Sequence, residues 1–199
     1  MSFVWNKNPE YVSENYNIVD LLLMDHKYLK ECCKIFKNSD DKKLKLKYAK
    51  SFIDTLKKHS KSEEKVVYDA LVDIQNFRDI ILEGEIEHDI CNSRISHISR
   101  KISSTKVYND KVEMQMKVLA EMVSHHLEEE EKNLFPLMRR SFSSEVLNQM
   151  GFQYMKVRGY TPRDLQEYPK LQKTLSNFKG VSTRLSPKYV ENVHLAFKR

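Results

Sequence analysis

Two histidine–glutamate pairs occur in the sequence at the same spacing. Glu63 follows His59 by four residues, and Glu130 follows His126 by four residues. On an α-helix this spacing places both side chains of a pair on one face, with their Cβ atoms about 5–6 Å apart. The segment that begins at His59 aligns without a gap on the segment that begins at His126. A repeat of this kind favours a shared chemical role for the two pairs over coincidence.

Each pair interrupts the apolar face of its predicted helix. The two faces are formed by Phe52, Leu56, His59, Glu63, Val67 and Ala70, and by Leu119, Met122, Val123, His126, Glu130, Leu134 and Leu137. A helix in a bundle turns its apolar face to the core. Burying an unpaired carboxylate costs several kcal/mol unless a charge or a metal ion compensates it. Either these faces are not buried, therefore, or something positive lies inside the bundle.

Two further histidines lie on apolar faces of other predicted helices. His26 shares its face with Val19, Leu22, Leu23, Leu29 and Cys33, and His88 shares its face with Ile81, Cys91 and Ile95. The chain thus consists of two predicted hairpins, each with one histidine helix followed by one His-x3-Glu helix. Packed with quasi-twofold symmetry, the hairpins would bring four imidazoles and two carboxylates to one depth in the bundle.

Such a set of side chains suits two transition-metal ions better than one. Nitrogen and oxygen donors without a thiolate indicate iron or manganese rather than structural zinc. Two ions about 3.5–4 Å apart can each take histidine ligands while Glu63 and Glu130 bridge them. With an added oxo or hydroxo bridge, about two coordination positions stay open for a small molecule.

The elements that must position these residues are long amphipathic helices. Four Gly and five Pro among 199 residues, with 31% charged residues, favour an all-α chain. The periodicity predicts helices over about 18–36, 41–74, 78–102 and 110–139, and a short helix over about 143–157. Short connections favour an antiparallel up-down-up-down four-helix bundle with a C-terminal helical or irregular extension. The expected divisions are an arm at 1–16, the bundle at 17–141 and a basic extension at 142–199, with one further helix near 163–177.

Charge and cysteine content indicate the setting of the protein. Residues 156–199 carry ten Lys or Arg and three Asp or Glu, a net charge of +7, whereas the whole chain carries +6. We expect no nucleic-acid partner, because the basic segment lacks interleaved aromatic residues, but a protein partner for this extension stays open. Three cysteines form no disulfide framework, and no apolar run approaches the roughly 18 residues of a membrane span. These features predict a soluble, cytoplasmic protein without a membrane association.

Neighbouring polar side chains have simpler interpretations. His125 is rotated by about 100° from His126 around the helix, so we expect it to be a neighbour and not a ligand. His97 falls on the opposite face from His88 and should be exposed. We expect Cys33 and Cys91 to pack as small apolar residues. Solvated helix faces are expected at Glu64, Glu128, Glu129 and Glu131.

The sequence combines His26, His59-x3-Glu63, His88 and His126-x3-Glu130, and it reads Glu-Glu-Lys-Asn-Leu-Phe-Pro from Glu130 onward. This combination resembles the hemerythrin-like (HHE cation-binding) family over about residues 15–145. That resemblance implies a four-helix bundle with a non-haem di-iron centre that binds oxygen, nitric oxide or related species. Oxygen-carrying members have a histidine where this chain has Asn92. The four-His, two-Glu set is more similar to bacterial iron-centre repair proteins and to hemerythrin-like sensor domains. The amino-terminal domain with paired cysteines typical of the repair proteins is not evident in the arm.

The resulting hypothesis is a hemerythrin-like di-iron protein that binds or senses O2, NO or iron, through metal ligands His26, His59, Glu63, His88, His126 and Glu130. One alternative is a di-iron enzyme that oxidises Fe(II) or turns over nitric oxide or peroxide. Another is an iron donor for the repair of damaged iron–sulfur centres. A metal-free helical interaction module is the remaining alternative, which metal analysis would separate from the others.

Overall fold

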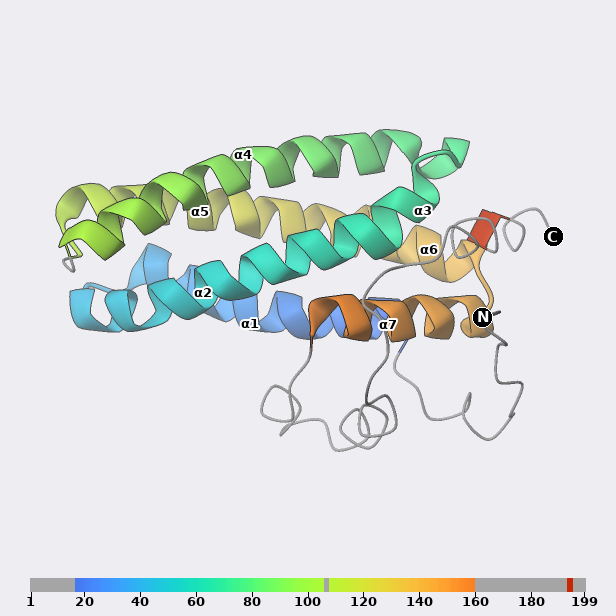
Figure 1. Cartoon of the computed structure of the whole chain (residues 1–199), viewed down its shortest axis with the longest axis horizontal. Coiled ribbons are helices and arrows are strands. Elements are labelled where there is room, and N and C mark those ends of the chain that lie inside the picture. The colour runs from blue at the N-terminus through green and yellow to red at the C-terminus, as the bar shows by residue number, and fades with distance from the viewer. Residues whose placement is uncertain (1–16, 106–107, 160–192, 195–199) are drawn as a thin grey trace, which may run out of the picture.

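The structure is a computed structural model that describes residues 17–105, 108–159 and 193–194. Its long helices are α1 (Ile18–Asn38), α2 (Lys42–Glu63), α4 (Gln75–Thr105), α5 (Asp110–Glu129) and α7 (Ser144–Arg158). In the described part of the chain these five helices pack in a bundle without strands, so the predicted all-α fold is confirmed (Figure 1). The predicted arm at 1–16 and the predicted helix near 163–177 lie outside the described residues.

Side-chain caps set the starts of four helices. The side chain of Asn17 accepts a hydrogen bond from the backbone N–H of Asp20, and that of Asp41 accepts from the N–H groups of Lys43 and Leu44. Asn109 and Ser143 cap α5 and α7 in the same way. Such caps satisfy N–H groups that have no partner within the helix. The turn signals of the sequence therefore mark the observed helix starts.

Two π-helical turns interrupt the helices that carry the His-x3-Glu pairs. The turn η2 (Glu64–Tyr68) joins α2 to the short α3 (Asp69–Leu71), and η3 (Glu130–Leu134) joins α5 to α6 (Phe135–Ser141). The sequence predicted one continuous helix over about 41–74 and another over about 110–139. Instead, Pro136 lies in the first turn of α6, directly after the π-turn. The wider turn also shifts the buried face, so that Met138 is fully buried and Leu137 only partly.

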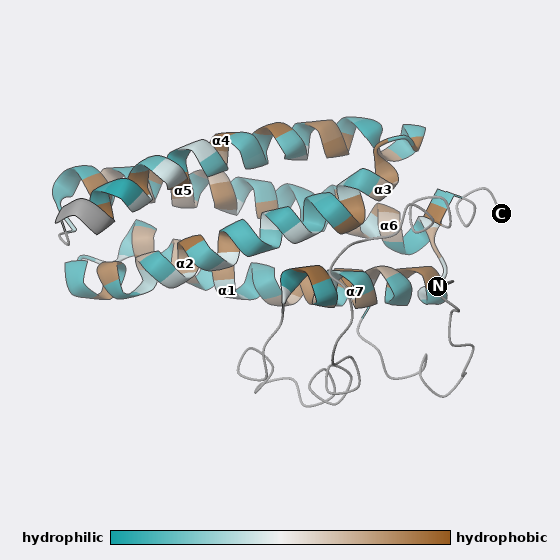
Figure 2. Ribbon diagram, viewed as in Figure 1, coloured by the Kyte–Doolittle hydropathy of each residue, from teal (hydrophilic) through white to brown (hydrophobic). Residues whose placement is uncertain are grey.

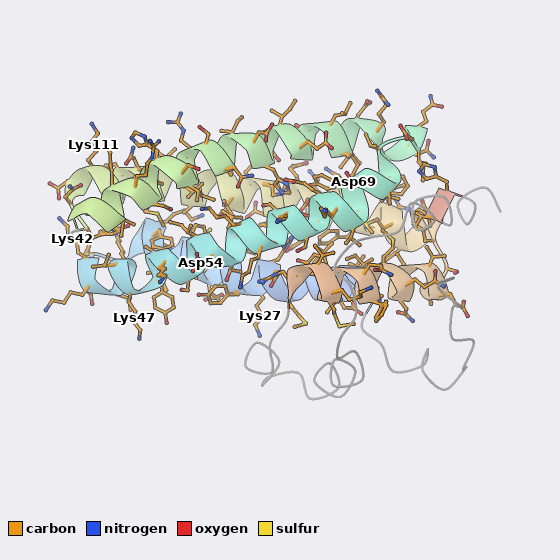
Figure 3. All side chains as sticks on the ribbon, in the orientation of Figure 1. Lys27, Lys42, Lys47, Asp54, Asp69 and Lys111 are labelled. Atoms are coloured by element: carbon orange, nitrogen blue, oxygen red, sulfur yellow. The ribbon has the colours of Figure 1, made fainter. Side chains whose placement is uncertain are left out.

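The first four long helices alternate in direction along the bundle, and α7 lies beside α1 and α2 (Figure 1). Hydrophobic and hydrophilic residues alternate along these helices (Figure 2), and the buried hydrophobic residues form the core. Charged side chains such as Lys47 and Lys111 point outward (Figure 3). Thus α7, within the predicted extension 142–199, packs as part of the bundle.

The buried apolar residues form two clusters, one toward each end of the bundle. On α1, Leu22 belongs to one cluster and Leu29 to the other, and His26 lies between them. The polar centre therefore lies between two apolar layers. Among the described residues, no helix is long and apolar enough to cross a membrane. Near the C-terminus, Nε2 of His194 donates to the backbone oxygen of Ala70 at 2.8 Å.

Candidate metal centre

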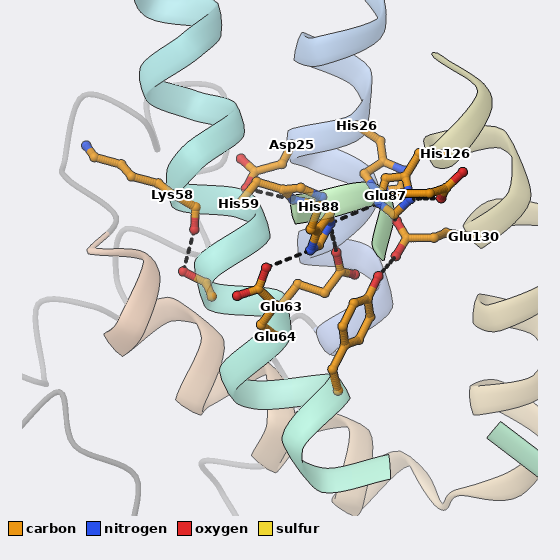
Figure 4. Close-up of polar contacts among 12 residues, drawn as sticks. Asp25, His26, Lys58, His59, Glu63, Glu64, Glu87, His88, His126 and Glu130 are labelled. Carbon is orange, nitrogen blue, oxygen red and sulfur yellow. Dashed lines mark hydrogen bonds and ion pairs between the residues drawn. The ribbon is translucent and has the colours of Figure 1, made fainter. Parts of the chain in front are cut away.

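All six side chains that the sequence singled out meet in the middle of the bundle (Figure 4). Each is buried, with an exposed fraction between 0% and 4%. They come from all four helices of the two predicted hairpins: His26 from α1, His59 and Glu63 from α2, His88 from α4, His126 from α5 and Glu130 from η3. The quasi-twofold convergence expected from the sequence is thus present in the structure.

The six side chains form two adjacent His/Glu triads. One consists of His26, His59 and Glu130, and the other of Glu63, His88 and His126. Within each triad, one potential ligand atom of every residue lies within 4.8 Å of the others. Two adjacent triads of nitrogen and oxygen donors are consistent with a binuclear metal site.

Each glutamate contacts histidines of both triads. Glu130 Oε2 lies 3.3 Å from Nε2 of His26 and 3.5 Å from Nε2 of His126. Glu63 Oε2 lies 3.4 Å from Nε2 of His59 and 3.8 Å from Nε2 of His88. Both carboxylates therefore lie between the two triads, where a bridging ligand must be.

Several inward-facing atoms of these residues have no hydrogen-bond partner among the described residues. They are Nε2 of His26, Nε2 of His59, both carboxylate oxygens of Glu63 and Oε2 of Glu130. Buried polar atoms without partners are costly, and a fold retains them where something else binds them. Their donor types and their convergence fit metal ions.

The outward nitrogen of each histidine faces an acidic residue. Nδ1 of His26 lies 3.0 Å from Glu131, that of His88 2.9 Å from Glu64, and that of His126 2.7 Å from Glu87. Nδ1 of His59 lies 3.6 Å from Asp25. A carboxylate at Nδ1 holds the proton there and leaves the Nε2 lone pair free for a metal ion.

These four acids were missed by the sequence interpretation, which placed Glu64 and Glu131 on solvated faces. The side chains of Glu64 and Glu131 are only partly exposed, at 38% and 29% respectively. The repeat itself held the signal. On the first helix of each hairpin, an acid directly precedes the histidine: Asp25 before His26 and Glu87 before His88. On the second helix of each hairpin, an acid directly follows the glutamate of the His-x3-Glu pair: Glu64 after Glu63 and Glu131 after Glu130.

A tyrosine touches the centre from the π-turn of the first hairpin. The hydroxyl of the buried Tyr68 donates to Glu130 Oε1 at 2.7 Å, and its ring stacks on His88 with centroids 5.3 Å apart. Gly84 on α4 makes room for it, because a Cβ at this position would lie 2.4 Å from the Tyr68 oxygen. The hydrogen bond orients Glu130 so that Oε2 faces the histidines.

Burial and neighbouring charges shift the pKa values of these groups in opposite directions. Burial and the charge of Glu130 raise the pKa of Glu63 well above its usual value. Burial lowers the pKa of His59 to about 4. In His26 burial also favours the neutral form, but Glu130 and Glu131 outweigh it and raise the pKa. Without metal, therefore, the centre favours the protonated form of Glu63 and the neutral form of His59.

The sequence matches the hemerythrin HHE cation-binding domain over residues 17–138. The chain belongs to the hemerythrin HHE cation-binding family. Comparison with curated proteins and with solved structures gave no match. The matched hemerythrin segment contains both triads and the four acids behind the histidines, and it ends before α7.

Two histidines and two cysteines that the sequence analysis set aside belong to neither triad of this hemerythrin domain. His125 and His97 are exposed. Cys33 and Cys91 are buried, with exposed fractions of 1% and 5%, and both are free thiols. Packing as small apolar residues, as expected from the sequence, is confirmed for both cysteines.

Proposed function

We propose that the two triads hold two non-haem iron ions and that the protein binds or senses oxygen or nitric oxide there. The observation that carries the proposal is the convergence of six buried donor side chains from four helices, several of whose inward-facing atoms have no hydrogen-bond partner among the described residues. Glu63 and Glu130 are proposed as bridging ligands, together with an oxo or hydroxo bridge. The four histidines His26, His59, His88 and His126 are proposed as terminal ligands. Iron bound in this way supplies redox chemistry and open coordination positions for a diatomic molecule.

The chain's own residues contribute three things to this function. The apolar layers on both sides of the centre exclude water. The acids behind the histidines keep each Nδ1 protonated and each Nε2 directed inward. Asn92, one helical turn after His88, supplies an amide where oxygen carriers of the family have another histidine, and an amide is a poor iron ligand. One iron is therefore expected to keep an additional exchangeable position.

Stopped-flow absorption spectroscopy of the iron-loaded protein tests the proposal. Reduced protein is mixed separately with oxygen and with nitric oxide, and the near-ultraviolet and visible bands are followed in time. Ligand binding predicts a spectral change that saturates at a fixed ratio of ligand to protein. Spectra that do not respond to either gas would contradict the proposed function.

A second candidate function is turnover of peroxide or nitric oxide at the same centre, and Tyr68 favours it. Its phenol is buried against Glu130, and burial together with the Glu130 charge raises its pKa well above the usual value. The group thus stays protonated, and a protonated phenol can donate both a proton and an electron. Continued consumption of peroxide or nitric oxide by wild type, reduced in Tyr68→Phe, would identify turnover rather than binding.

We retain three further proposals. They are iron donation to damaged iron–sulfur proteins, a cytoplasmic location, and a protein partner for the basic extension. A direct assay for the first is transfer of iron from loaded protein to a cluster-free acceptor. Iron that stays with the protein would exclude the donor role.

A further inference from the structure

Helix α7 lies beyond the segment that matches the hemerythrin family, yet two of its side chains reach the centre. The family match ends at residue 138, and α7 begins at Ser144. This helix packs against α1 and α2. On its inner face Tyr154 is fully buried, and Arg158 is 8% exposed. Both side chains contact the surroundings of His59.

Tyr154 fixes the hydrogen-bonding state of His59. The tyrosine hydroxyl donates its single proton to Asp25 Oδ2 at 2.7 Å, and its oxygen lies 3.2 Å from Nδ1 of His59. Because that proton is already used, the contact with His59 requires an Nδ1–H that donates to the tyrosine oxygen. The Nε2 atom of His59 then carries a lone pair and lies 3.4 Å from Glu63.

Arg158 holds the carboxylate that Tyr154 contacts. Its Nε donates to Asp25 Oδ2 at 2.8 Å and its terminal nitrogen donates to Asp25 Oδ1 at 3.1 Å. A two-point contact of this kind fixes the orientation of the carboxylate as well as its position. Asp25 is 5% exposed, so water offers it little competition.

The other three histidines are supported differently. The acids behind them, Glu64, Glu87 and Glu131, have side chains between 27% and 38% exposed. All three lie within the segment that matches the family. Within the described part of the chain, neither Glu64 nor Glu87 pairs with a lysine or arginine. His59 therefore depends on a buried support that α7 completes.

We propose that Tyr154 and Arg158 are positioning residues of the metal centre. Through Asp25 they hold His59 in the tautomer that presents Nε2 to a metal ion, so α7 sets the affinity of one of the two metal positions. This inference rests on the proposed function, because it requires that the triads bind two metal ions. It goes beyond that function by assigning part of the centre to a helix outside the matched domain.

Anaerobic titration of the metal-free full chain with Fe(II) tests the proposal. Tyr154→Phe removes only the hydroxyl, and Arg158→Met removes the two-point contact. Loss of a residue that orients a metal-binding histidine typically weakens metal binding by about 10- to 100-fold. We expect a loss of this size in one of the two binding steps, with the other step unchanged. The Mössbauer spectrum of the Fe(II)-loaded variants should differ from wild type in one iron component only.

Two further variants separate positioning from general destabilisation. Met155→Ala removes a buried α7 side chain, 2% exposed, that forms no hydrogen bond with Asp25 in the described part of the chain. This variant should lower the unfolding temperature while both binding steps are kept. Glu87→Gln acts behind His126 and should weaken the other step. If wild type binds two Fe(II) ions and both Tyr154→Phe and Arg158→Met match it in both binding steps, this inference is overturned while the proposed function stands. Equal weakening of both steps in all α7 variants would overturn it too. Wild type that binds fewer than two Fe(II) ions would overturn the proposed function itself.

Discussion

Replacing Glu63 by glutamine is expected to change how the stability of the metal-free protein depends on pH. Glu63 is fully buried, and neither of its oxygens has a hydrogen-bond partner among the described residues. Burial and the nearby Glu130 raise its pKa well above the usual 4.5. Between pH 4.5 and that raised pKa, therefore, the folded chain holds a proton on Glu63 that the unfolded chain has already lost.

The size of the effect follows from this one proton. Between the usual and the raised pKa of Glu63, the free energy of unfolding falls by about 1.4 kcal/mol for each unit that the pH rises. This loss continues until the pH reaches the raised pKa of Glu63. Glutamine cannot titrate, so the free energy of unfolding of Glu63→Gln should not show this loss and should rise relative to that of wild type as the pH rises through this window.

Other groups of the centre also titrate, but they act in both proteins. The pKa of His59 is lowered to about 4, so its contribution to stability rises with pH between about 4 and 6.5. The pKa of His26 and that of His126 are raised above 6.5, so their contributions are lost as the pH rises through the folded-state values. The difference between variant and wild type therefore reports the titration of Glu63 together with its effect on the neighbouring Glu130.

Urea unfolding followed by circular dichroism, with a chelator present, measures this difference at about pH 5.5, 6.5 and 7.5. Glu128→Gln, at an exposed position, is the control and should follow wild type at each pH. A constant difference between Glu63→Gln and wild type at all three values would refute the reasoning. In the metal-loaded wild type the trend should reverse, because metal binding displaces the Glu63 proton.

Two further predictions concern groups near the centre. Gly84→Ala should displace the Tyr68 hydroxyl from Glu130 and lower the free energy of unfolding by about 1.5–3 kcal/mol, the usual contribution of a hydrogen bond to a charged group. The same change in a Tyr68→Phe background should cost less, and equal costs in urea unfolding would exclude this mechanism. Burial raises the pKa of Cys33 and that of Cys91 to about 11, so both stay as unreactive thiols at about pH 8. Mass spectrometry should find them alkylated by iodoacetamide only in urea, and rapid alkylation of the native protein would contradict their burial.

The fold and the six inward side chains could be predicted because both follow from local patterns. Helix starts depend on caps such as Asp41 and Ser143, which lie next to the turns they end. The spacing of His59 and Glu63 fixes a shared helix face without knowledge of any distant contact. Its repetition at His126 indicates that the face has a chemical role.

The remaining features depend on contacts that the sequence does not encode locally. The sequence around an acid such as Glu131 reads the same whether its side chain is solvated or contacts His26. No residue pattern in the sequence marks the π-turns. Their effect is evident only in the structure, where the buried face of the helix includes Met138 in place of Leu137. Arg158 meets Asp25 across more than a hundred residues of chain, so helical periodicity could place α7 but not its partner.

Elemental analysis of the purified protein after iron-replete expression tests the central claim most directly. The two triads predict about two irons per chain in wild type. Glu130→Ala, which removes a proposed bridging ligand, should lower that content, whereas Glu128→Ala, at an exposed position, should keep it. One zinc per chain, no metal at all, or equal iron in both variants would contradict the account.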